Sequence, residues 1–69
     1  MRQVDRLLRH LTDFGSITPM EAYEDYGIMR LSARIADLKD SGHVITTEMV
    51  EGKNRDGDRV RYARYRMEG

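Results

Sequence analysis

The residues with the clearest chemical potential lie near the C-terminus, where basic side chains recur at short intervals with tyrosines between them. Guanidinium and ammonium groups at such spacing suit contacts with successive phosphates of a nucleic-acid backbone or minor groove. Arginine also protects exposed strands from edge pairing, which is the competing structural explanation. We favour phosphate binding because half of the 12 Lys and Arg residues are concentrated here: Lys53, Arg55, Arg59, Arg61, Arg64 and Arg66.

The charge of the chain is distributed unevenly, although its formal total is zero. Residues 1–51 contain six basic and nine acidic residues, a net charge of −3, whereas residues 52–69 contain six basic and three acidic residues, a net charge of +3. A neutral protein is not driven to DNA by its total charge. A basic C-terminal segment can still provide a local phosphate-binding surface, and we expect Lys53, Arg55, Arg59 and Arg61 to form it.

A second group of candidate contacts follows Gly27, on a predicted helix over about residues 29–41. A helical wheel places Leu31, Ile35 and Leu38 together on the buried side. The opposite side has few bulky residues, so it could enter a DNA major groove about 12 Å wide. A merely solvated helix face is the structural alternative.

The side chains nearest the bases on that face would be Met29, Arg30, Ser32 and Ala33. We expect Arg30 to read guanine or to bind a phosphate, and Ser32 to donate a hydrogen bond to either. Arg34 lies nearer the buried stripe, so we expect it to contact a phosphate or to pair with an acid on the preceding helix.

Catalytic and metal-dependent chemistry has little support in the sequence. There is no cysteine, and His10 and His43 lie far apart without metal-ligand spacing, so we expect both histidines at the surface. No glycine-rich phosphate loop or nucleophile motif is present. We therefore predict a non-enzyme without a cofactor. No apolar run approaches the roughly 20 residues of a membrane span, and we expect a cytoplasmic protein.

The helices that position these groups follow from periodicity and capping. An apolar stripe predicts a first helix over about residues 2–13, ended by Gly15. A capping box from Thr18 to Glu21, with Pro at its first helical position, begins a short helix over residues 19–25. Gly27 then supplies the left-handed turn before the third helix. The residues of the first stripe are Val4, Leu7, Leu8, Leu11 and Phe14.

Alternating residues after Gly42 predict a β-hairpin over about residues 43–67, and a very short strand at Ser16-Ile17 is expected to pair with it. Two registers are plausible. A two-residue Asp56-Gly57 turn would oppose Met49 and Arg64. A three-residue loop, Asp56-Gly57-Asp58, would instead pair Met49 with Tyr65, Thr47 with Met67 and Glu48 with Arg66. We prefer the second register because it matches apolar with apolar and acid with base, including a weak surface ion pair of Glu48 with Arg66.

These elements predict one α+β domain over residues 1–69, a winged helix-turn-helix of three helices followed by a two-stranded wing. The residues from Gly15 to Ile45, followed by KNRDGDRVRYARYR, resemble a family of small winged helix-turn-helix proteins common in bacteriophages and prophages. The resemblance extends from Val4 to Met67, and its most specific pieces are Ser16-Ile17-Thr18, Glu21-Ala22, Gly27, the run from Arg30 to Ile35, Leu38, Gly42 and Ile45.

The resemblance implies a DNA-binding regulator in a bacterial host cell. One departure is Tyr23, four residues before the turn glycine, where a small residue usually lets the two helices cross. We expect either that Ala22 takes over the crossing or that the helix angle differs.

The sequence thus predicts a double-stranded DNA-binding protein, a phage or prophage transcriptional regulator with its third helix in the major groove and its wing on the backbone. A homodimer or a phage or host protein are further expected partners. Two alternatives remain open: an interaction module that docks a protein through the acidic second helix (Glu21, Glu24, Asp25), and an excisionase-like factor that bends DNA.

Overall fold

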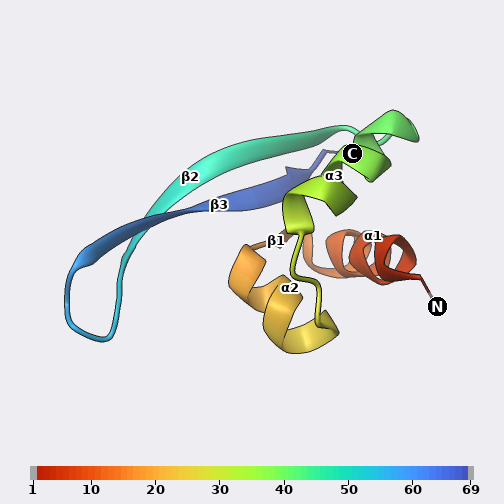
Figure 1. Ribbon diagram of the computed structural model, residues 1–69. Helices are drawn as coiled ribbons and strands as arrows, with labels where there is room; N and C mark the ends of the chain where they lie inside the picture. The colour runs from red at the N-terminus through yellow and green to blue at the C-terminus, as the bar shows by residue number, and fades with distance from the viewer. Residues whose placement is uncertain (1, 69) are drawn as a thin grey trace.

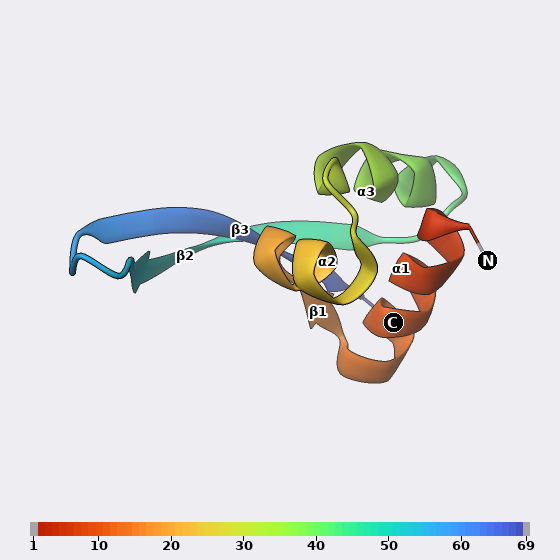
Figure 2. The same cartoon turned by 60° about the horizontal axis from the view of Figure 1, so that its bottom comes forward.

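The computed structural model describes residues 2–68, and within this range it has three helices and a three-stranded antiparallel sheet (Figure 1). The elements in chain order are α1 (Gln3–Phe14), β1 (Ser16–Ile17), α2 (Pro19–Tyr26), α3 (Leu31–Asp40), β2 (Ile45–Lys53) and β3 (Arg59–Met67). The strand order is β1-β3-β2. The three helices gather at one end and the β2–β3 hairpin extends away from them (Figure 2). The predicted α+β fold, three helices followed by a hairpin wing, is confirmed.

The core lies between the helices and the base of the sheet. Helical spacing places Leu7 and Leu11 of α1 against Leu31, Ile35 and Leu38 of α3, and burial of each such side chain stabilises the fold by about 1.5–3 kcal/mol. Among residues 2–68 the buried apolar residues are Leu7, Leu11, Ile17, Ala22, Ile28, Leu31, Ile35, Leu38 and Ile45. Ile45 is the one member of this set from the β2–β3 hairpin, and Tyr65 and Met67 at the base of β3 are partly buried against it, so the outer part of the wing adds nothing to the core.

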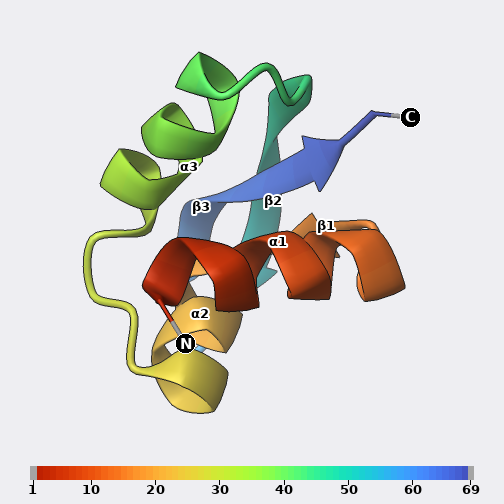
Figure 3. The ribbon, with the colours of Figure 1, turned by 90° about the vertical axis from the view of Figure 1, so that its right-hand side faces the viewer.

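One residue of the predicted α1 stripe lies outside the core. Phe14 is 72% exposed, whereas Val4 and Leu8 are half-buried against the core. Phe14 is the last residue of α1, and Figure 3 shows this end of the helix beyond α2 and α3. Phe14, the last residue of the predicted apolar stripe, is therefore left uncovered, because the stripe continues past α2 and α3.

The start of α2 and the turn after it have the predicted local chemistry. The Thr18 hydroxyl accepts a hydrogen bond from the Glu21 amide (3.3 Å), and the Glu21 carboxylate accepts one from the Thr18 amide (2.9 Å). Gly27 ends α2 with φ +67°, a conformation that favours glycine. Ala22 is fully buried and Tyr23 is exposed, so Ala22 provides the small residue at the helix crossing.

The third helix begins later than predicted. It starts at Leu31, so Met29 and Arg30 belong to the connection from α2 and not to the helix itself. The cause is Ile28, which is buried in the core and whose amide donates to the Ala22 carbonyl oxygen (3.1 Å). The chain must then pass from that anchor to the helix, and Arg30 provides no side-chain cap.

The hairpin has neither of the two predicted registers. Met49 pairs with Ala63, and Glu48 pairs with Arg64. The register preferred from the sequence, with Met49 opposite Tyr65, is shifted by two residues from the observed one. It therefore gave the correct residues on each face of the hairpin but the wrong cross-strand partners. The loop contains five residues, 54–58, where a three-residue loop was predicted. The short strand β1 is confirmed, with Ser16 opposite Arg66 on the other edge of β3.

Asn54 explains the longer loop. Its side-chain oxygen accepts hydrogen bonds from the amides of Asp56 and Asp58, both at 3.0 Å. Its carbonyl oxygen accepts a third from the amide of Gly57, which has φ +85°. Asn at the first position and Gly at the fourth position of a type I turn are the residues that this turn favours.

Candidate nucleic-acid interface

The outer side of α3 and of the turn before it is open to solvent. Met29 is 81% exposed, and Arg30 and Ser32 are also exposed. Ala33 is half-buried. Leu31, Ile35 and Leu38 hold the helix from the other side. The predicted candidates Met29, Arg30, Ser32 and Ala33 therefore lie on an accessible surface, with the first two on the turn.

Arg34 pairs with a different residue from the one that was predicted. Its Nε lies 3.3 Å from Oδ2 of Asp37, one turn further along the same helix. The prediction of a partner on α2 is wrong, because residues three apart on a helix are neighbours and Asp37 is closer than any acid of α2. Both side chains remain partly exposed, so the pair is weak.

The end of the wing concentrates positive charge. Lys53 and Arg59 are directly opposite each other where the hairpin closes, and Arg55 lies in the loop between them. Like charges opposite each other destabilise a hairpin. Within residues 2–68 these three side chains and Arg61 are exposed and have no carboxylate within 4.0 Å. The arrangement stores a repulsion that a bound polyanion would relieve.

The base of the wing is balanced instead. Glu48 lies 3.3 Å from Arg66 and 3.7 Å from Arg64, measured between carboxylate and guanidinium atoms. The predicted pair of Glu48 with Arg66 is confirmed, and Arg64 joins it because the two arginines flank Glu48 on one face. This cluster neutralises part of the basic segment, so the cations free to bind an anion are those towards the tip.

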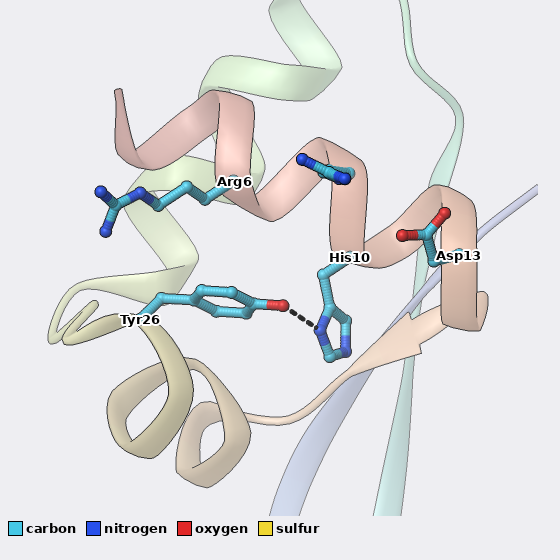
Figure 4. Close-up of a pocket in the computed structure, with 5 residues that line it drawn as sticks. Arg6, His10, Asp13 and Tyr26 are labelled. Carbon is cyan, nitrogen blue, oxygen red and sulfur yellow. Dashed lines mark hydrogen bonds between the residues drawn. The ribbon is translucent and has the colours of Figure 1, made fainter. Parts of the chain in front are cut away.

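A pocket of about 370 Å³ between α1 and α2 is the other candidate site (Figure 4). His10 forms one wall, and its Nδ1 is 2.7 Å from the Tyr26 hydroxyl. His10 is only 5% exposed, so the prediction of a surface histidine is wrong. Its ring is covered by Phe14 and Tyr26, at centroid distances of 4.7 and 5.4 Å. The side chain of Arg6 extends away from His10, as Figure 4 shows, so the hydrogen bond serves to join α1 to α2.

Sequence reasoning missed two contributors to these surfaces. Asn54 orders the wing loop, and the Asn-to-Gly spacing of a type I turn was the available signal. Tyr26 holds His10, and no local pattern indicated that contact between residues sixteen positions apart. Among residues 2–68, no three His, Asp or Glu side chains gather to hold a metal ion. None of the helices described is long and apolar enough to cross a membrane.

Comparison with known proteins gives one family. A family model described as a winged helix-turn-helix domain matches residues 2–68. No significant match was found among curated proteins or among solved structures.

Proposed function

The chain belongs to this winged helix-turn-helix domain family, and we propose that it is a double-stranded DNA-binding protein that regulates transcription for a phage or prophage in the bacterial cytoplasm. Domains of this class are generally DNA-binding and not enzymes. The observation that carries the proposal is the pairing of an open α3 surface with a wing tip whose cations face one another without acidic partners.

The two surfaces would divide the work of recognition. The α3 side approaches the base edges, with Met29, Arg30, Ser32 and Ala33 nearest them, and small side chains allow a close approach. Arg30 is the candidate for bidentate contact with guanine. Arg34 reaches a phosphate beside the groove. Of the four side chains nearest the bases, only Arg30 and Ser32 can donate hydrogen bonds to a base, so the sequence preference would be modest.

The wing would hold the backbone. Lys53, Arg55, Arg59 and Arg61 have the reach and the charge to neutralise phosphates, and Asn54 holds their loop in one conformation. Neutralising about four to six phosphates gives a slope of roughly −4 to −5 in a plot of log affinity against log salt.

Selection of bound duplexes from a random pool, repeated at two salt concentrations, tests the proposal. We expect enrichment of a motif of a few base pairs at the higher salt concentration, with weaker total binding. Binding without enrichment would leave only backbone contact, and no binding of any duplex at moderate salt would overturn the proposal.

A protein-interaction function is the second candidate, because α2 presents exposed acidic and apolar side chains together. Met20 and Tyr23 are 64% and 57% exposed beside Glu24 and Asp25. Reversing the charge of Arg30 and Arg34 to Glu separates the two functions. Loss of duplex binding by a folded double variant favours DNA reading through α3, whereas unchanged duplex binding excludes it.

A further inference from the structure

The outer edge of β2 is long, regular and unpaired. β2 is an edge strand in the order β1-β3-β2, and Figure 1 shows it on the side of the sheet away from β1 and α2. Over residues 2–68 its backbone hydrogen bonds go to β3 alone. Its nine pairs with β3 run without a bulge from Ile45 to Lys53. Natural edge strands are usually short, bulged, interrupted by Pro or covered, and this one is none of these.

The direction of the free backbone groups follows from the ladder. The Glu68 amide donates to the Val44 carbonyl oxygen, so Val44 and every second residue after it face β3. The amides and carbonyls of Thr47, Met49 and Glu51 therefore face outward, with those of Ile45 and Lys53 at the two ends.

One of the two acidic side chains of this edge strand is neutralised within the chain, because Glu48 is held by Arg64 and Arg66 on β3. Glu51 and Lys53 are exposed on the same strand and have opposite charges. Met49 is 55% exposed at the centre of the strand. The charges along the edge therefore nearly cancel, which lowers the electrostatic obstacle to strand pairing.

We propose that two copies of this chain pair through their β2 edges, antiparallel and around a two-fold axis at Met49, to form one continuous six-stranded sheet. In this register Thr47 lies opposite Glu51 of the second copy, Glu48 opposite Val50, and Ile45 opposite Lys53. No two like charges are directly opposite. Sliding the register by two residues towards the base would place Glu48 opposite itself, so charge disfavours that shift relative to the register centred on Met49.

The pairing also bears on DNA binding, and this part rests on the proposed function. The two-fold axis is perpendicular to the sheet, so both sets of helices lie on the same face. Eight strand steps separate the two Ile45 residues by roughly 27 Å. That distance is comparable with the turn of B-DNA, about 34 Å, that separates the half-sites of dimeric helix-turn-helix proteins. We expect two inverted half-sites in the preferred duplex.

Introducing a charge of either sign at position 49 tests the pairing without DNA. By light scattering during size-exclusion chromatography, the wild-type chain is expected to have the mass of two chains. Met49→Lys and Met49→Glu each place like charges on the axis, so each alone is expected to have the mass of one chain. An equimolar mixture is expected to recover the mass of two, because Lys then faces Glu.

Tyr23→Lys is the matched control, since Tyr23 is exposed to a similar extent but lies on α2, and it should keep the mass of two chains. Circular dichroism of each variant establishes that it is folded. A single-chain mass for the wild type at all concentrations up to about 1 mM, or a two-chain mass for folded Met49→Lys, would overturn the proposal. Absence of duplex binding by a wild-type dimer would count against the proposed function and leave the pairing intact.

Discussion

The α3 surface and the wing tip differ in how they are held and in what they offer a ligand. α3 is fixed by three buried side chains and presents small, nearly neutral groups. The wing tip has no buried side chain, and among residues 2–68 its Lys53, Arg55 and Arg59 are exposed without a carboxylate within 4.0 Å. Specificity needs a rigid surface near the bases, whereas backbone affinity needs charge with reach. Under the proposed function, the first region would read sequence and the second would supply affinity.

The largest expected effect is a loss of stability caused by a substitution in the helical region. Leu11→Ala removes a fully buried side chain of α1 and should lower the free energy of unfolding by about 2–5 kcal/mol. A domain of this size has little stability to spare, so the variant should be largely unfolded near 37 °C. Urea denaturation measures the loss, with Met20→Ala on the exposed side of α2 as the control, expected to change by less than about 0.5 kcal/mol.

A second effect concerns affinity. Replacing Lys53, Arg55 and Arg59 together by Gln should weaken binding to every duplex and reduce the salt slope by about 3, since three phosphate contacts are lost. The hairpin should remain folded, because removing like charges that face each other relieves repulsion. Fluorescence anisotropy at several salt concentrations measures both. An unchanged slope would mean that the tip does not contact DNA.

A third effect concerns specificity. Arg30→Ala should reduce discrimination at one base pair by about 1–3 kcal/mol, the usual size of a good bidentate contact. Binding to unrelated duplexes should change much less. Competition between a selected duplex and its single-base variants measures the discrimination. An equal loss of affinity for all sequences would instead assign Arg30 to a phosphate.

The smallest expected effect is on the wing loop. Gly57→Ala meets no neighbouring atom within 4 Å, but the positive φ at this position strains any other residue, so a loss of about 1 kcal/mol is expected. Thermal unfolding measures it. Asp56→Ala, in the same loop without a positive φ, is the control and should unfold within a degree or two of the wild type.

The features that could be predicted from sequence are those set by nearby residues. The capping box of Thr18 and Glu21 and the left-handed glycines at 15 and 27 depend on local backbone chemistry alone. The alternation along β2 and β3 gave the correct faces. The register was missed because an ordered Asn54 side chain competed with the Asp-Gly turn, and side-chain pairing alone could not decide between loop lengths.

The remaining errors have tertiary causes. α3 starts late because Ile28 enters the core before the helix can begin. The packing of α1 on α2 brings Tyr26 close to His10. The Tyr26 hydroxyl then satisfies Nδ1 of His10 through a hydrogen bond, so the imidazole can be buried. Candidate contact residues could be chosen from composition and helical position. The concentration of unpaired charge at the tip, however, could be recognised only from the strand register, which places Lys53 opposite Arg59.

The most direct test is a titration of the ¹⁵N-labelled protein with a selected duplex, followed by amide chemical shifts. Two separated groups of residues should respond, 29–36 around the start of α3 and 53–61 at the wing tip, while Tyr23 and Glu24 on the outer side of α2 stay unchanged. Shifts confined to α2, with residues 29–36 unaffected, would contradict the assignment of α3 as the DNA-reading element.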